Sequence, residues 1–239
     1  MANLRGEERA RYVADMFGRI STKYDLLNTV MSGGRHYAWR RKTVSMAVGY
    51  VSGEALDVAT GTGDFLFDLL SRGAVTRAIG VDFTPEMLDI ARQKALDRGL
   101  SDKIELVTGD AHRLPFDDER FICVTVGFGV RNFVDLPKAI AEMWRVLKPG
   151  GRLAILEIVK SDSSGPWSKL TAIGFRWAAP LIGSALAGNR DAYTYLPESV
   201  EGFLSARELA GLMRSAGFRY VSYRKLGMGT VAILLGTKV

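Results

Sequence analysis

The chain has 239 residues, 47% of them hydrophobic and 24% charged, a balance typical of a globular protein and unlike that of a disordered one. Its single cysteine, Cys123, excludes an internal disulfide, and its two histidines are too far apart in sequence to form a recognisable metal motif, so we expect no metal site. The formal net charge of +6 allows contact with nucleic acid or an anionic membrane surface but requires neither.

The sequence contains no strong targeting or membrane-spanning signal. The N-terminal run Met1–Glu8 lacks an apolar signal core. The longest weakly charged stretch, Leu170–Gly188, is interrupted by Arg176 and Pro180. We therefore expect a cytoplasmic protein.

Residues 1–50 are predicted to form a helical N-terminal cap. Apolar side chains recur there at helical spacing, at Val13, Met16, Phe17 and Ile20. A break at Ser32-Gly33-Gly34 precedes a second helix, from about His36 to Val48. This second helix is basic, and its cationic face either is simply solvated or meets anionic lipid or an acidic substrate; the residues are Arg35, His36, Arg40, Arg41 and Lys42.

Strands and helices alternate over residues 51–160, which predicts βαβ units and a mostly parallel sheet. The predicted strands are Ala55–Val58, Ala78–Val81, Ile104–Val107, Phe121–Val126 and Arg152–Glu157. The predicted helices are Phe65–Ser71, Pro85–Ala95 and Leu136–Leu147. We expect Lys148-Pro149-Gly150-Gly151 to stop the last of these helices and turn the chain into the next strand.

Residues 161–204 break the alternation and are predicted to form a helical lid, rich in aromatic side chains, inserted into the core. Ser205 and Glu208 have the spacing of a capping box and open a helix that runs to Ser215. Two final strands, Phe218–Arg224 and Thr230–Leu235, are expected to pair antiparallel at the edge of the sheet. Residues 205–239 would thus complete the α/β core.

The strongest functional signal is a glycine-rich turn between a predicted strand and a predicted helix. Gly61 and Gly63 allow the backbone to turn tightly and to approach a ligand closely. About twenty residues later Asp82 ends the next predicted strand. In nucleotide-binding folds an acid at this position holds the ribose hydroxyls of the bound nucleoside. The pattern indicates an adenosine-type cofactor, and the alternative is a tight turn with no ligand.

The turn departs from the dinucleotide fingerprint because Leu66 stands where a third glycine would be. Asp64 would repel a pyrophosphate at the start of the following helix, and Asp57 is also a poor neighbour for phosphate. Two acids around a glycine turn favour a cationic ligand. S-adenosylmethionine fits, because it has a ribose, an ammonium, a sulfonium and no phosphate.

Ligands of open α/β sheets bind beyond the carboxyl ends of the strands, so the residues that follow each strand are the candidate cofactor ligands. Asp110, with the Ala111 backbone beside it, is placed to accept the adenine amino group, or else caps a turn. Phe83 and Met87 either flank the adenine or pack in the core. The full set of candidates is Asp57, Thr60, Gly61, Thr62, Gly63, Asp82, Phe83, Met87, Asp110, Ala111 and Gly127.

Arg131 and Asn132 follow the glycines after the fourth predicted strand. An arginine at this place can hold a phenolate-like oxygen with charge-assisted hydrogen bonds. The alternative is a salt bridge to a nearby acid such as Asp135.

Four longer runs resemble a known family. They are Tyr24–Ser32 followed by His36 and Trp39, Arg145–Gly151 followed by Leu156-Glu157, Phe128–Asn132, and Tyr193–Ser199. By these runs the chain resembles the C-methyltransferases of quinone biosynthesis, which act on prenylated benzoquinols and naphthoquinols in ubiquinone and menaquinone synthesis. Leu27 departs from the family pattern, in which methionine is usual.

The resemblance implies a Rossmann-like class I methyltransferase fold, with a seven-stranded, mostly parallel sheet and an antiparallel last strand. It implies S-adenosylmethionine as cofactor, S-adenosylhomocysteine as product, and contacts from Thr62, Asp82, Asp110 and Ala111. The family often has serine where Gly127 stands, so only a backbone contact is expected there. Ala59 replaces the first glycine of the general motif, which is tolerable where φ is negative.

The expected reaction aligns an electron-rich ring carbon with the methyl group and excludes water. We expect Arg131 to orient a quinol oxygen. The base is left open between His36, Asp25, Tyr24, Tyr193 and a water held by Arg131; His36 has the most suitable intrinsic pKa, but a histidine beside Trp39 is more often structural. The lid and cap would shelter the isoprenoid tail, and the basic face would dock on anionic lipid.

Three other functions are weighed against this one. The first is methylation of another small molecule or lipid with the same cofactor pocket. The second is RNA binding or methylation, prompted by the charge, although no RNA-binding motif is present and we expect no nucleic-acid partner. The third is a catalytically silent cofactor-binding module. The oligomeric state is left open, with a homodimer as one option.

Overall fold

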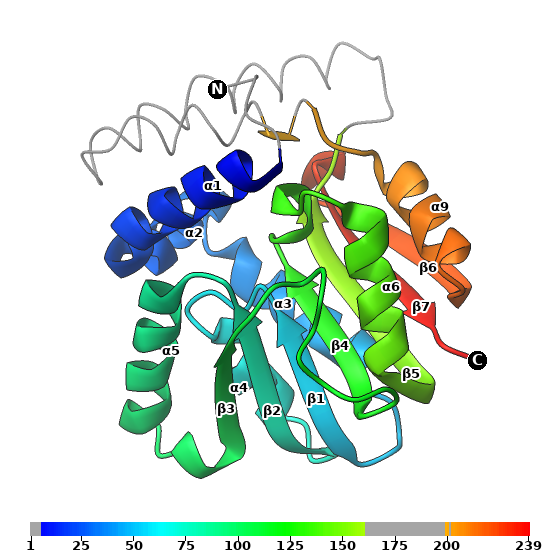
Figure 1. Ribbon diagram of the computed structural model, residues 1–239, viewed down its shortest axis with the longest axis horizontal. Coiled ribbons are helices and arrows are strands. Elements are labelled where there is room, and N and C mark those ends of the chain that lie inside the picture. Colours follow the sequence, from blue (N-terminus) through cyan, green and yellow to red (C-terminus); the bar gives the residue numbers. More distant parts are fainter. Residues whose placement is uncertain (1–5, 161–198, 201) are drawn as a thin grey trace.

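The computed structural model describes residues 6–160, 199–200 and 202–239, and shows an α/β fold built on one seven-stranded sheet (Figure 1). The strand order is β3-β2-β1-β4-β5-β7-β6. The strands are β1 (Gly53–Val58), β2 (Val75–Asp82), β3 (Ile104–Thr108), β4 (Phe121–Gly127), β5 (Leu147–Ile158), β6 (Arg219–Leu226) and β7 (Val231–Thr237). All neighbours pair in parallel except β7, which is antiparallel to both β5 and β6. The predicted sheet is confirmed.

Helices cover both faces of the sheet. They are α1 (Gly6–Ile20), α2 (Tyr24–Ser32), α3 (Arg35–Ala47), α4 (Asp64–Leu70), α5 (Pro85–Asp97), α6 (Leu136–Val146) and α9 (Ala206–Ser215). Short 3-10 turns are η1 (Ser21–Lys23), η2 (Ser101–Lys103), η3 (Val130–Asn132) and η4 (Gly227–Gly229). In Figure 1, α6 and α9 cover the near face of the sheet, and α3 and α4 lie behind it. Among the described residues, no helix is both long and apolar enough to cross a bilayer.

Side-chain alternation along β1 assigns its residues to the two faces. Leu56 and Val58 pack into the core cluster that also holds side chains of α6 and α9. Ala55 lies on the opposite face, in a cluster with Val44 of α3 and Leu66 of α4. Successive side chains of a strand point to opposite faces, so this apolar run fills both layers of the core.

The connection from β3 to β4 is an irregular segment, residues 109–120, rather than a helix. Arg145 of α6 holds it by donating hydrogen bonds to the carbonyl oxygens of Leu114 and Phe116, at 3.0 and 2.8 Å. Glu142, one turn earlier, accepts the amide of Leu114 at 2.9 Å. These contacts fix the segment that carries Asp110, one of the predicted ligand residues.

The expected turn at Lys148–Gly151 is wrong, because these residues belong to β5. The strand begins directly after α6 and contains an irregularity, since Leu147 pairs with Phe121 whereas Arg152 pairs with Cys123. Gly150 has φ of 79° and donates its amide to Lys238 at 2.7 Å. The glycines therefore form a bulge inside a strand, which the sequence pattern does not distinguish from a loop.

The N-terminal helices are a separate layer that rests on α5 and on the loop after β1. Val13, Met16 and Ile20 of α1 bury with Leu27 of α2, as the helical spacing predicts. Gly33 and Gly34 have φ of 57° and 73° and break the chain between α2 and α3. Asp25 of α2 accepts a hydrogen bond from Thr62 in the loop after β1, which ties this cap to the core.

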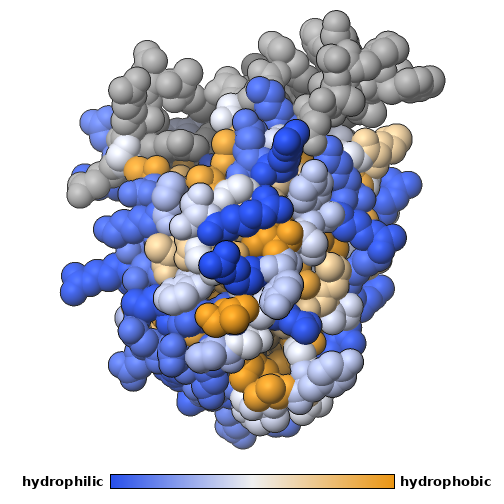
Figure 2. All heavy atoms as spheres, turned by 90° about the vertical axis from the view of Figure 1, so that its right-hand side faces the viewer, coloured by the Kyte–Doolittle hydropathy of each residue, from blue (hydrophilic) through white to orange (hydrophobic). Residues whose placement is uncertain are grey.

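The closing segment of the chain follows the predicted pattern. Ser205 and Glu208 form the capping box of α9. The edge strand β6 exposes cationic side chains along its length, at Arg219, Arg224 and Lys225. Figure 2 shows this side of the molecule as a mainly hydrophilic surface with apolar residues scattered through it. Charged side chains on an open edge oppose strand pairing with other molecules.

Candidate functional site

A cavity of about 450 Å³ opens at the carboxyl ends of the parallel strands. It brings together four of the candidate ligands, Asp82, Phe83, Asp110 and Ala111. Its other lining residues are Gly6, Val58, Ala59, Val81, Gly109, His112, Asn132, Phe133, Val134, Asp135 and Lys138. Acids set in a mainly apolar wall are suited to a nucleoside, which presents hydroxyls and an amino group on flat rings.

Asp82 ends β2 and is buried beside the glycine turn. Its carboxylate accepts the amide of Gly61 at 2.8 Å and the amide of Thr84 at 2.9 Å. Burial raises its pKa above 3.8, although these amides favour the charged form. The glycine turn and Asp82 therefore hold each other in place. A carboxylate fixed in this way is pre-organised to accept hydrogen bonds from hydroxyl groups.

Asp110 follows β3 and is held by a residue that the sequence analysis did not select. The backbone amide of His112 donates to Asp110 Oδ1 at 3.0 Å, and its ring Nδ1 lies 2.5 Å from the same oxygen. Burial alone would raise the pKa of Asp110, but these contacts hold it below 3.8. The role of His112 depends on tertiary partners, so an isolated histidine gave no signal.

The glycine turn is shaped by three residues with left-handed backbone. Gly61 has φ of 53° and Gly63 has φ of 80°. A Cβ on Gly63 would lie 2.9 Å from the Cβ of Ala91, so glycine is also what lets α5 approach the turn. Ala59 has φ of 54°, so the condition under which alanine was expected to be tolerable is not met. Non-glycine residues in this region are strained, and such strain gathers at functional sites.

Asp57 is buried at the end of β1 and is not part of the cavity lining. Its carboxylate accepts the hydroxyls of Thr60 at 2.7 Å and Thr125 at 2.6 Å. Burial raises the pKa of Asp57 to about 7, against the effect of these two hydrogen bonds. The hydrogen bond from Thr60 to Asp57 thus stabilises the start of the turn, and the one from Thr125 joins β4 to β1.

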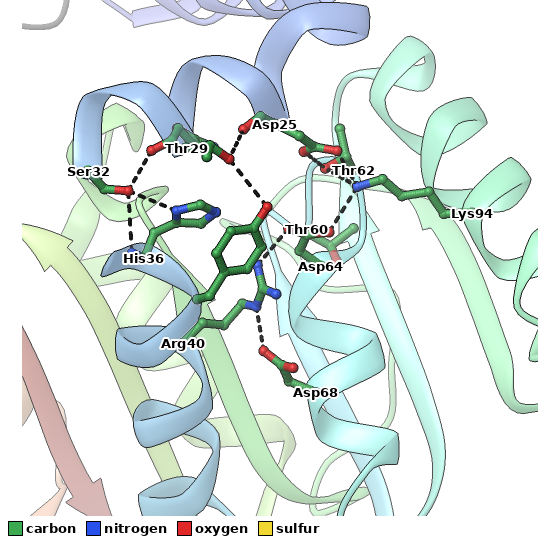
Figure 3. A network of polar contacts seen from close by, with 12 residues as sticks. Asp25, Thr29, Ser32, His36, Arg40, Thr60, Thr62, Asp64, Asp68 and Lys94 are labelled. Carbon is green, nitrogen blue, oxygen red and sulfur yellow. Dashed lines mark hydrogen bonds and ion pairs between the residues drawn. The ribbon is translucent and has the colours of Figure 1, made fainter. Parts of the chain in front are cut away.

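The expected role of Asp64 in favouring a cationic ligand is wrong. Its carboxylate already pairs with Lys94 at 2.9 Å and with Arg40 at 2.6 Å (Figure 3). Burial would raise its pKa, but these two cations hold it below 3.8. An acid neutralised by two cations does not select the charge of a ligand.

Thr62 faces the cap rather than the cavity. Its hydroxyl donates to Asp25 of α2 at 2.7 Å and accepts from Lys94 of α5 at 3.0 Å. Lys94 also pairs with Asp25 at 2.5 Å, and Figure 3 shows these side chains converging from two helices and the turn. The cap is therefore tied to the same turn that Asp82 holds from the other side.

Two further candidates lie outside the cavity lining. Met87 is buried in α5. Gly127 ends β4, and a Cβ there would lie 2.2 Å from the ring of Phe65. That ring fills the space that the serine of the family pattern would need, which explains glycine at this position.

Arg131 lies in η3 and is buried. It pairs with Glu157 of β5, at 2.6 Å, rather than with Asp135, and it donates to the carbonyl of Phe128 at 2.6 Å. Two of the family-like runs, Phe128–Asn132 and Leu156-Glu157, therefore meet in one buried ion pair. Asn132, next in sequence, lines the cavity.

Two candidate catalytic residues, Tyr24 of α2 and His36 of α3, belong to the predicted N-terminal cap. His36 is buried and its Nδ1 lies 2.8 Å from Ser32 Oγ, which itself donates to the carbonyl of Asn28 at 2.6 Å. Nδ1 must therefore carry the proton, and Nε2 is the basic nitrogen. Burial, followed by the charge of Arg40, lowers the pKa of His36 below 6.5. Burial raises the pKa of Tyr24 above 10.0, and Tyr193 lies outside the described residues.

The predicted basic face of α3 is smaller than expected. His36 turns into the cap, and Arg40 pairs with Asp64 and Asp68. The cations left toward solvent are Arg35 and Arg41, with Lys42 half-buried. Two of the five predicted side chains therefore do not belong to the basic face.

Comparison with known proteins decides the family. Residues 4–238 match the ubiE/COQ5 methyltransferase family. The chain belongs to this family. It is 45% identical to the demethylmenaquinone methyltransferase of Deinococcus radiodurans, over 97% of this chain and 95% of that protein. It is 39% identical to the ubiquinone/menaquinone biosynthesis C-methyltransferase UbiE of Pseudomonas putida, over 97% of this chain and 90% of that protein.

Solved structures show the same fold at lower identity. A SAM-dependent methyltransferase from Thermotoga maritima, described as a possible histamine N-methyltransferase, has a TM-score of 0.66 at 20% identity, over 94% of this chain and 99% of that one. The [4+2]-cyclase SpnF has a TM-score of 0.68 at 21% identity, over 95% and 94%. Because one of these is a cyclase, the fold alone does not fix the reaction.

Proposed function

We propose that this ubiE/COQ5 family protein is an S-adenosylmethionine-dependent C-methyltransferase that methylates the ring of a prenylated quinol. The observation that carries the proposal is the cavity at the ends of β1 to β4, where Asp82 and Asp110 stand in an apolar wall. The names of its relatives, which include demethylmenaquinone methyltransferases, support the substrate class.

The cavity residues fit the nucleoside part of this cofactor. Asp82, anchored by two amides, would accept the ribose hydroxyls, and Asp110 would accept the adenine amino group. Phe83 and Ala111 supply apolar surface for the purine. When bound, the cofactor supplies an electrophilic methyl group to the acceptor ring.

The residues toward the acceptor are proposed to act by orientation. Arg131, positioned by Glu157, would hold a quinol oxygen, and Asn132, next in sequence, lines the cavity. His36, with a basic Nε2, is the base that we favour, and Tyr193 is a further candidate. Proton removal by such a group typically contributes about 10²–10⁴-fold to a rate, so a water in its place would leave measurable activity.

We infer that the cap side of the molecule meets the membrane in which such a quinol lies. Leu26 and Val30 project from α2 with 52% and 41% exposure, one helical turn apart. Arg35 and Arg41 add positive charge on the neighbouring helix. Exposed apolar side chains beside cations suit an anionic bilayer surface, and binding to anionic but not to neutral vesicles is the expected result.

Turnover of matched acceptors tests the proposal. Purified protein, labelled cofactor and either reduced demethylmenaquinone or a reduced demethylated benzoquinol are incubated in the same detergent. Label should enter the ring of at least one quinol. Label in neither quinol, together with transfer to an unrelated acceptor, would contradict the proposed substrate.

A further inference from the structure

His112 stands between two walls of the cofactor cavity. One wall is the loop after β3, which carries Asp110, and the other is the loop before α6, which runs from Asn132 to Asp135. The ring Nδ1 lies 2.5 Å from Asp110 Oδ1. On its other side, ring Nε2 accepts the backbone amide of Asp135 at 3.0 Å.

The two contacts fix the tautomer of the ring. A nitrogen that accepts a backbone N–H carries no proton, so Nε2 is the unprotonated nitrogen and Nδ1–H donates to Asp110. A neutral histidine can make both contacts only in this form.

The second contact reaches further into the structure. Asp135 is the N-cap of α6, and its side chain accepts the amide of Lys138 at 3.1 Å. The ring of Phe133 meets the His112 ring edge to face, at 5.9 Å between centroids. One imidazole thus connects the loop after β3 to the start of α6.

Asp110 needs such support, because its side chain is 66% exposed on a loop. A carboxylate in that setting has several rotamers open to it, and ordering it costs free energy on binding. Both contacts from His112 go to Oδ1, so they hold the carboxylate in one orientation toward the cavity.

We propose that His112 is a positioning residue for the adenine of the cofactor: its Nδ1–H orients Asp110, and its Nε2 holds the opposite wall through Asp135. This inference rests on the proposed use of S-adenosylmethionine. It assigns to this chain a determinant of adenine recognition that acts through Asp110.

Two near-isosteric variants separate the contacts. The amide of His112→Asn reaches the place of Nδ1 and keeps a donor for Asp110, whereas the amide of His112→Gln reaches the place of Nε2 and keeps an acceptor for Asp135. Calorimetric titration with S-adenosylhomocysteine and with S-inosylhomocysteine, in which an oxygen replaces the adenine amino group, reads out adenine recognition without turnover.

Wild type should prefer S-adenosylhomocysteine. His112→Gln should lose about 10-fold in affinity for it, and most of the preference, because a hydrogen bond to a charged group is lost. His112→Asn should keep the preference. Asp89→Asn, which removes an exposed ion pair with Arg92, is the matched control and should behave as wild type.

The outcomes are distinct. If wild type does not bind S-adenosylhomocysteine, the proposed function fails. If wild type binds it and His112→Gln keeps both affinity and preference, the role of His112 is refuted. A double-mutant cycle of His112→Gln with Asp110→Asn gives a second test. The double variant should lose no more affinity for S-adenosylhomocysteine than Asp110→Asn alone. Additive losses of affinity would show that His112 does not act through Asp110.

Discussion

The end of β1 and the turn that follows it combine a buried acid with a strained backbone within three residues, 57–59. Ala59 has a left-handed backbone, and Asp57 is buried below it with two hydroxyl partners. Both features cost folding free energy, and Ala59 lines the cavity at the strand ends. Such residues persist when the surrounding structure holds them in place, and each gives a measurable prediction.

Replacing Ala59 with glycine should stabilise the protein. A left-handed backbone costs a non-glycine residue about 1–2 kcal/mol, and the greater entropy of unfolded glycine offsets part of the gain. Urea denaturation should show an increase of about 0.5–1 kcal/mol in the free energy of unfolding. Ala141→Gly, at an exposed position inside α6, is the control and should lose about 1 kcal/mol. A loss of similar size at Ala59 would contradict the strained geometry.

Asp57 should make stability fall as the pH rises. Its folded pKa of about 7 lies above the ordinary 3.8, so burial carries no penalty below pH 4 and the full penalty above pH 7. Denaturation of Asp57→Asn at a series of pH values should therefore show a gain over wild type that grows between these limits, by roughly 2–4 kcal/mol.

Asp64 provides the control of opposite sign. Its ion pairs hold the folded pKa below 3.8, so they contribute stability above that value and lose it as the pH falls through the folded pKa. Asp64→Asn should destabilise the protein at pH 7 and have little effect in strong acid. A constant difference between wild type and Asp57→Asn across the pH range would rule out the buried, raised acid.

Among the elements, the junction between cap and core is the most informative. Asp25, on α2, reaches Thr62 of the glycine turn and Lys94 of α5. These contacts tie α1 and α2 to the core at the glycine turn. Movement of the cap therefore changes the support of the turn itself.

Asp25→Asn should loosen the cap. The amide can still accept from Thr62, but the ion pair with Lys94 is lost. Hydrogen exchange at the amides of α1 and α2 should become about 2–10-fold faster, while exchange in the central strands should not change. Asp89→Asn is again the control. Unchanged exchange in α1 and α2 would show that this ion pair does not hold the cap.

Across the whole molecule, periodic features were predictable from sequence. The apolar runs gave the strands and their order along the chain, and the rule that ligands lie beyond strand ends selected Asp82 and Asp110. The ends of elements were harder to predict where glycine can form either a turn or a bulge inside a strand, as at Gly150. The strands, and the place of these two acids at the strand ends, could be predicted because they depend on residues close together in the chain.

Features set by tertiary partners could not be predicted in this way. Arg131 pairs with Glu157 of β5 rather than with Asp135, its neighbour in sequence. Asp64 is neutralised by Arg40 and Lys94, from helices on either side of it in the chain. His112 gains its place in the site from contacts to two loops. The acids around the turn therefore do not explain selectivity for a cation, and the family relationship carries that part of the assignment.

Calorimetric titration of the wild-type protein with S-adenosylhomocysteine, NADH and ATP tests the central assignment of the cavity most directly. The account predicts one S-adenosylhomocysteine bound per chain, much weaker binding by Asp82→Asn, and no heat from NADH or ATP. Tight binding of NADH or ATP, with none of S-adenosylhomocysteine, would contradict it.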